Sequence, residues 1–188
     1  MNPILVVLAH PALHRSHINK TLFQATQSLE GVTFRDLYEL YPDFDINVSI
    51  EQEILNAHSA IVFQHPFYWY SCPSLLKEWM DRVLTYGWAY GENGTALHGK
   101  ALMSAISAGG AANAYHPEGQ NRYTINQFLV PFEQTANLCG MAYIEPFIFF
   151  SSNRATQQDI QLHAQSYASR LCALRDGAPL PLFSGTKR

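Results

Sequence analysis

The sequence alternates short, largely apolar runs with longer segments in which apolar residues recur at helical spacing. A run of this length and composition is typical of a strand that is buried on both faces. Parallel neighbours need crossover connections, which the helical segments would provide. We therefore expect an α/β domain with a five-stranded parallel sheet, strand order 2-1-3-4-5, and helices on both faces. The strand-like runs are residues 4–8, 32–37, 60–64, 101–107 and 143–150.

Local signals predict where the helices begin. Ser16 is a good N-cap for the helix that follows the first strand. Ser49 with Gln52, and Thr156 with Asp159, form capping-box patterns at the start of two more helices. Two further helices are expected after Pro73 and at residues 126–138.

The length of the chain fits a single domain over residues 1–175. Residues 85–99 contain four glycines and follow neither strand nor helix periodicity, which predicts a long loop. Residues 176–188 contain Gly and Pro and are expected to form a flexible C-terminal tail.

Composition excludes several classes of protein. Twelve Lys and Arg against fifteen Asp and Glu give a net charge of −3 without a basic stripe, so a nucleic-acid partner is not expected. The apolar run of residues 4–9 is too short to span a membrane and lacks the flanks of a secretory signal, which favours the cytoplasm. Cys72, Cys139 and Cys172 are widely spaced, as expected of reduced thiols rather than of disulfides or a zinc site.

The candidate site lies in the loops that follow the strands, because ligands of doubly wound sheets bind beyond the carboxyl ends. The loop of residues 10–19 lacks both the GxGxxG and the GxxxxGK[ST] motif, which disfavours Rossmann and P-loop chemistry. It does lead into a helix N-terminus, which favours a phosphate. The alternatives are that Ser16 only caps the helix and that the loop histidines are solvated. No carboxylate set accompanies these histidines, so no metal is expected.

Two further loops are suited to a flat ligand. Residues 67–70 are four consecutive aromatics after the third strand, more than a core needs, and an isoalloxazine ring requires an apolar wall. Gly109 and Gly110 follow the fourth strand and allow a close approach of the backbone, although an ordinary turn is the alternative.

Together these loops resemble the NAD(P)H:quinone oxidoreductase branch of the flavodoxin-like superfamily across almost the whole chain. Within this branch, several segments resemble KefF and KefG, ancillary subunits of glutathione-gated potassium efflux systems. The resemblance to the branch rests on four segments: His10-Pro11, Gln64-His65-Pro66-Phe67-Tyr68-Trp69-Tyr70, Gly87-Trp88-Ala89-Tyr90-Gly91 and Gly109-Gly110. The resemblance to the ancillary subunits rests on Tyr41-Pro42-Asp43-Phe44, Leu75-Leu76-Lys77-Glu78-Trp79, residues 94–100 and Asn121-Arg122-Tyr123.

The resemblance implies a site for FMN, which the short family members use in preference to FAD. Tyr115 matches a family tyrosine near the flavin and is the candidate catalytic hydrogen-bond donor. The family often has threonines where Ser107 and Ala108 stand, so weaker flavin binding is expected here. The implied flavin-binding residues are His10, Ser16, His17, Ile18 and Asn19 for the phosphate and ribityl arm, Phe67, Tyr68, Trp69 and Tyr70 along the ring, and Ser107, Ala108, Gly109 and Gly110 at the pyrimidine side.

Trp88 and Tyr90 fall where the family places aromatic contacts to the substrate, reaching over the flavin of the neighbouring subunit. Packing within the loop is the alternative. Exposed apolar residues on a long loop are better explained by an interface than by solvent, so a homodimer is expected.

The leading functional hypothesis is an FMN-dependent oxidoreductase in which NAD(P)H transfers a hydride to flavin N5 and is replaced by a quinone or another electrophile. The second is a regulatory subunit that activates a glutathione-gated potassium efflux transporter from the cytoplasmic face of the inner membrane, with redox activity secondary. The third is a flavin-free domain that binds another flat ligand.

Overall fold

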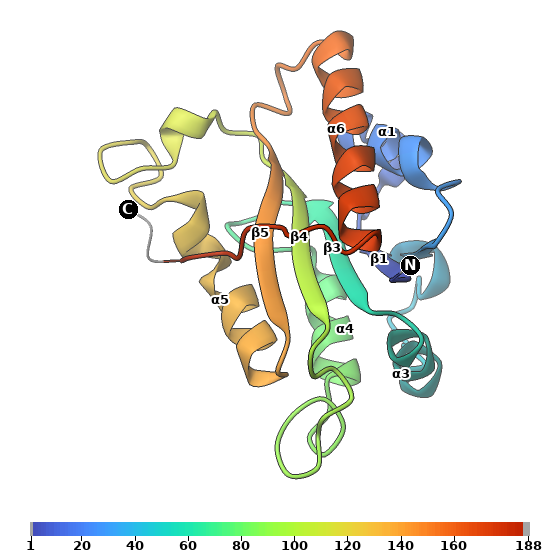
Figure 1. The fold of residues 1–188 in the computed structure, drawn as a ribbon. Coiled ribbons are helices and arrows are strands. Elements are labelled where there is room, and N and C mark those ends of the chain that lie inside the picture. Colours follow the sequence, from blue (N-terminus) through green and yellow to red (C-terminus); the bar gives the residue numbers. More distant parts are fainter. Residues whose placement is uncertain (1, 186–188) are drawn as a thin grey trace.

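A sheet of five parallel strands forms the centre of the molecule, whose computed structural model describes residues 2–185. The strands lie in the order β2-β1-β3-β4-β5, and each is parallel to its neighbour (Figure 1). The predicted fold class, strand order and strand direction are therefore confirmed. The strands are β1 (Ile4–Leu8), β2 (Val32–Asp36), β3 (Ala60–Pro66), β4 (Ala101–Ser107) and β5 (Ala142–Phe149).

Helices cover both faces of this sheet (Figure 1). One face carries α1 (His17–Thr26) and α6 (Gln157–Arg175), and the other carries α3 (Val48–Asn56), α4 (Ser74–Val83) and α5 (Ile125–Leu138). A single turn, α2 (Leu37–Leu40), follows β2, and 3-10 turns η1 (Leu13–Arg15) and η2 (Ala112–Ala114) follow β1 and β4.

The apolar core has two layers because successive residues of a strand point to opposite faces. Leu5 and Val7 of β1 pack into the layer under α4 and α5, while Ile4 and Val6 pack under α1 and α6. All residues of β1 are buried, which explains why its sequence has no polar position.

A buried carboxylate joins β2, α3 and α4. Glu51 accepts hydrogen bonds from Arg35, from the Tyr41 hydroxyl (2.6 Å) and from the Trp79 indole N–H (2.9 Å). Glu51 and Trp79 are fully buried. We call these four residues the Glu51 cluster. It fixes α3 and α4 to β2, the edge strand that carries Arg35.

The helix caps agree with the sequence at two of three places. Ser16 accepts from the backbone N–H of Asn19 (3.0 Å), and Thr156 forms a capping box with Asp159, as expected. The cap predicted at Ser49 is wrong. Asn47 caps α3 instead, its side chain accepting from the N–H of Ile50 at 3.2 Å.

The segment after α6 differs from the flexible tail expected from residue 176 onward. Leu182 forms an antiparallel bridge with Ile144 on β5, and Phe183 is buried against Tyr143. The N–H of Glu145 donates to the Pro181 carbonyl (2.9 Å), so this segment lies along the outer edge of β5. Residues 186–188 of the expected tail lie outside the described residues.

Candidate functional site

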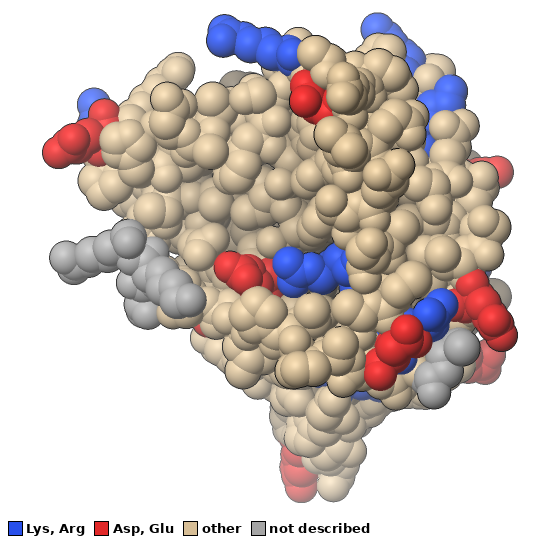
Figure 2. Space-filling model, turned by 45° about the horizontal axis from the view of Figure 1, so that its top comes forward, with Lys and Arg blue, Asp and Glu red and all other residues tan. Residues whose placement is uncertain are grey.

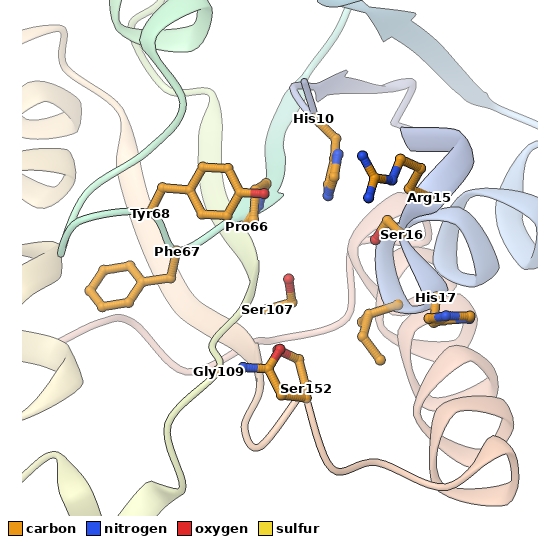
Figure 3. Close-up of a pocket in the computed structure, with 12 residues that line it drawn as sticks. His10, Arg15, Ser16, His17, Pro66, Phe67, Tyr68, Ser107, Gly109 and Ser152 are labelled. Atoms are coloured by element: carbon orange, nitrogen blue, oxygen red, sulfur yellow. The ribbon is translucent and has the colours of Figure 1, made fainter. Parts of the chain in front are cut away.

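A cleft of about 400 Å³ opens at the carboxyl ends of the strands, where the loops after β1, β3, β4 and β5 meet. Figure 3 shows Phe67 and Tyr68 on one side of this cleft and Arg15, Ser16 and His17 on the other. The surface at this end of the molecule is mostly uncharged (Figure 2). The cleft is lined by His10, Arg15, Ser16, His17, Ile18, Pro66, Phe67, Tyr68, Ser107, Gly109, Ser152 and Asn153.

One end of the cleft is suited to an anion. Ser16, His17 and Ile18 form the N-terminus of α1, where backbone N–H groups have no partner within the helix. Arg15 adds a full positive charge beside them, and no Asp or Glu lines the cleft. Together with the helix dipole, this environment stabilises a phosphate.

His10 contributes a neutral imidazole to the cleft. Its Nδ1 accepts from the backbone N–H of Ala12 (3.1 Å), which leaves Nε2 to carry the proton. Burial lowers the pKa of His10, so the ring is uncharged at neutral pH. The ring meets that of Tyr68 edge-on at 6.3 Å, and in Figure 3 the Tyr68 hydroxyl points toward it.

The cleft continues into a second cavity of about 580 Å³, with which it shares Phe67, Gly109 and Asn153. Trp69, Tyr70 and Tyr115 also line this second cavity. Trp69 and Tyr70 adopt positive φ angles (48° and 62°), which is unusual for residues other than glycine and often marks a ligand site. Trp69 is 92% exposed, so very little of its surface is covered by the described residues.

The two glycines after β4 allow two side chains to approach the backbone closely. A Cβ atom at Gly109 would lie 2.9 Å from Nδ2 of Asn153, and one at Gly110 would lie 3.1 Å from the Tyr115 ring. Burial raises the pKa of Tyr115, so its hydroxyl stays protonated and can donate a hydrogen bond. Gly110 therefore leaves the space in which the Tyr115 ring approaches the backbone, and Gly109 does the same for Asn153.

A layer of buried polar side chains lies beneath the cleft. Nδ2 of Asn19 donates to the hydroxyl of Ser107 (2.9 Å), while Oδ1 of Asn19 is buried without a partner among the described residues. A buried polar atom without a partner costs free energy, so a bound ligand would offset that cost. Gln64, whose side chain donates to the Asn19 carbonyl, was not predicted as part of the site.

The structure brings most of the predicted flavin-binding residues together, and it separates some. His10, Ser16, His17, Ile18, Phe67, Tyr68, Ser107 and Gly109 line the cleft, and Trp69, Tyr70, Gly110 and Tyr115 line its continuation. Asn19 lies just beneath, and the Ala108 side chain is fully buried in the core. Arg15, Pro66, Ser152 and Asn153 were missed.

Trp88 and Tyr90 do not line the cleft of their own chain. Residues 85–99 form a loop before β4, at the end of the sheet opposite to the cleft (Figure 1). Both side chains are partly buried against the core, and Tyr90 lines a groove with Met80 of α4 and Leu138 of α5. Contact of these residues with a ligand in the cleft would therefore require a second copy of the chain.

These features fit FMN. The basic end of the cleft suits its phosphate, the unpaired Asn19 Oδ1 suits a ribityl hydroxyl, and the aromatic continuation suits its ring. No group of His, Cys, Asp and Glu in residues 2–185 is arranged to hold a metal ion.

Fold and site together define a flavodoxin-like α/β protein with a ligand cleft at the carboxyl edge of its sheet. The chain belongs to the family described as "Flavodoxin-like fold", whose model matches residues 2–171. It is 46% identical to the glutathione-regulated potassium-efflux system ancillary protein KefG of Pectobacterium carotovorum over 178 residues, 95% of this chain and 94% of the relative. It is 44% identical to KefF of Salmonella newport over 179 residues, 92% and 97% of the two chains. The resemblance to these ancillary subunits is confirmed.

Two solved structures share the fold and much of the sequence. The general stress protein 14 of Treponema denticola, in complex with FMN, has a TM-score of 0.88 and 39% identity, covering 92% of this chain and 99% of that one. An NADPH-quinone reductase from P. pentosaceus has a TM-score of 0.82 and 32% identity, covering 89% and 96%.

None of the helices within residues 2–185 combines the length and the apolar character that crossing a bilayer requires.

Proposed function

We propose that this protein is an FMN-dependent NAD(P)H oxidoreductase that reduces quinones or other electrophiles by two-electron transfer. The observation that carries the proposal is the continuity of the site. A basic helix N-terminus and an aromatic cavity belong to one cleft, with Phe67, Gly109 and Asn153 shared between its two parts. The FMN complex and the NADPH-quinone reductase among the similar structures support it.

Each part of the cleft has a role in this proposal. The N-terminus of α1 and Arg15 hold the phosphate, and Ser107 and Asn19 hold the ribityl chain. Phe67 and the following aromatics form the wall against the ring. Bound FMN would supply hydride acceptance from NAD(P)H and two-electron donation to the acceptor. The protein would orient it and, through the protonated Tyr115 and backbone amides, stabilise negative charge.

The visible absorption spectrum of the purified protein, with and without added FMN, tests this function. We expect a yellow complex that bleaches anaerobically when NADH or NADPH is added and recovers its colour with a quinone. Titration of each nicotinamide separately gives the preference between them. A protein that takes up no FMN contradicts the proposal.

The oxidoreductase is proposed to act as a homodimer in which Trp88 and Tyr90 of one copy reach the cleft of the other. Their distance from their own cleft supports this arrangement, and so does the groove beside Tyr90, which joins the apolar Met80, Leu84 and Leu138 to the ion pair of Lys77 and Asp81. Light scattering coupled to gel filtration measures the mass in solution. A monomer at all concentrations would contradict it.

A second function is favoured by the relatives named KefG and KefF, which match more than nine tenths of this chain. We propose that the protein also binds the cytoplasmic face of a glutathione-gated potassium efflux transporter and raises its activity. Co-purification of the tagged protein with such a transporter, compared with an unrelated potassium channel, is the test. A soluble reductase without this role would be recovered with neither.

A further inference from the structure

Two fully buried polar side chains meet below the cleft although they are far apart in the sequence. The hydroxyl of Tyr167 on α6 donates to Oε1 of Gln64 on β3 at 3.1 Å. Both residues have no exposed surface. Neither lines the cleft or its continuation, so neither can contact a ligand bound there.

From Gln64 the hydrogen bonds continue to the cleft. Nε2 of Gln64 donates to the backbone carbonyl of Asn19 (3.1 Å) in the first turn of α1, and Nδ2 of Asn19 donates to Oγ of Ser107 (2.9 Å). We call Tyr167, Gln64, Asn19 and Ser107 the Gln64 chain. It connects α6, β3, α1 and β4 and ends at a residue that lines the cleft.

The chemistry of the groups determines which one donates and which one accepts in each hydrogen bond of the Gln64 chain. A carbonyl oxygen can only accept, so the amide nitrogen of Gln64 must face Asn19, and its oxygen must face the Tyr167 hydroxyl. Because Ser107 accepts from Asn19, the proton of its own hydroxyl remains available for a group in the cleft. The backbone N–H groups at the start of α1 bind an anion only when the first turn is held at the correct angle.

We propose that Gln64 and Tyr167 are positioning residues of the flavin site. They hold the first turn of α1, and through Asn19 the Ser107 hydroxyl, in the geometry that receives the phosphate and ribityl chain. The inference rests on the proposed function for the identity of the ligand. A glutamine in a buried strand is otherwise costly, and its pairing at both ends accounts for its place in β3.

Two substitutions test the proposal with one matched control. Tyr167→Phe removes only the hydroxyl, and Gln64→Met removes both hydrogen bonds at similar volume. The control is Tyr143→Phe, since Tyr143 is also buried and bonds a serine hydroxyl, that of Ser104 (2.7 Å), but lies away from the cleft. FMN binding is measured by quenching of flavin fluorescence. We expect the Kd to rise about tenfold for Tyr167→Phe and more for Gln64→Met, with the control within about twofold of the wild type.

Amide hydrogen exchange of the flavin-free proteins supplies a readout that needs no ligand. Asn19, whose N–H is bonded to Ser16, and residues 20–22, whose N–H groups are bonded within the helix, should exchange faster in both Gln64-chain variants than in the wild type and the control. If either this exchange or the Kd matches the control, the positioning role is overturned. If the wild type binds no FMN, the proposed function fails instead, and exchange alone decides whether these residues hold α1.

Discussion

Two groups of buried polar side chains in this molecule differ in how completely they are hydrogen-bonded. In the Glu51 cluster both carboxylate oxygens accept from protein donors, Oε1 from Arg35 and Tyr41 and Oε2 from Trp79. The Gln64 chain instead ends at Ser107, in the lining of the cleft, and leaves Oδ1 of Asn19 unpaired within the described residues. Nε of Arg35 also has no partner among the described residues, but the buried carboxylate of the Glu51 cluster is fully paired and stabilises the fold. An unpaired buried oxygen beside a cavity instead indicates a ligand.

The largest effect is expected at Glu51. Its removal in Glu51→Ala leaves Arg35 without its buried partner, so the free energy of unfolding should fall by about 3–5 kcal/mol. Urea denaturation measures the loss. The FMN affinity of the folded fraction should remain unchanged, because the cluster does not touch the cleft. Asp81→Ala is the control, since Asp81 pairs with Lys77 on the surface and should contribute less than about 1 kcal/mol. A weaker flavin affinity in Glu51→Ala would contradict the separation of the two regions.

His65 extends the comparison to a residue with an unpaired atom that lines neither part of the cleft. It stacks on Phe132, its Nε2 has no partner among the described residues, and burial lowers its pKa to about 4. The unfolded chain, with a pKa near 6.5, therefore takes up the proton first as the pH falls. The contribution of His65 to the free energy of unfolding is complete above about pH 6.5 and should decline by about 3 kcal/mol towards pH 4.

The His65→Phe variant isolates the contribution of His65 to the free energy of unfolding, measured by denaturation from pH 7 to pH 4. Phenylalanine keeps the stacking on Phe132 but does not titrate, so the decline should be shallower than in the wild type. His163, whose pKa is also lowered to about 4 by burial, would still contribute. An equal decline in both proteins would show that His65 is not responsible.

Arg15 tests whether the basic end of the cleft recognises a phosphate. In Arg15→Gln the Kd for FMN should rise about tenfold, as expected when a charge-assisted hydrogen bond is lost. The Kd for riboflavin, which has no phosphate, should stay the same, and so should the Kd for FMN in the α4 surface variant Arg82→Gln. Equal losses for FMN and riboflavin would place the effect elsewhere.

The smallest effect on flavin affinity is expected from substitutions in the loop of residues 85–99, at the end of the sheet opposite to the cleft. Trp88→Ala and Tyr90→Ala should raise the KM for a quinone several-fold while the Kd for FMN changes less than twofold. Steady-state kinetics beside a flavin titration separates the two quantities. An unchanged KM would indicate that both residues serve only to pack the loop.

Much of the fold could be predicted from the sequence because burial on both faces leaves a clear pattern. The predicted bounds of β1 and β4 agree with the structure, and those of β3 and β5 differ by one or two residues. The cap of α3 was missed because Ser49 and Gln52 match a capping box, whereas Asn47 two residues earlier has the extended backbone a cap needs. Gln52 instead donates to the Val83 carbonyl (2.9 Å), a contact no local pattern encodes.

The site was predictable where its residues follow a strand and not where they come from distant elements. Gln64 and Tyr167 are separated by 103 positions, and their pairing depends on how α6 packs. A signal for Gln64 was present, since it is a polar residue at the end of an apolar run. Ser152 and Asn153 lie in the loop after β5, where no aromatic run or glycine pair indicates a ligand.

The chain segment that lies along β5 has a consequence for solubility. β5 is the last strand of the sheet, and an open edge offers unpaired backbone groups to any other extended chain. Here the Pro181 carbonyl and the N–H of Phe183 are bonded to Glu145 and Tyr143, which occupies part of that edge. The segment thus blocks pairing of this part of β5 with a strand of another molecule. A protein shortened to residue 179 would be prone to self-association through β5.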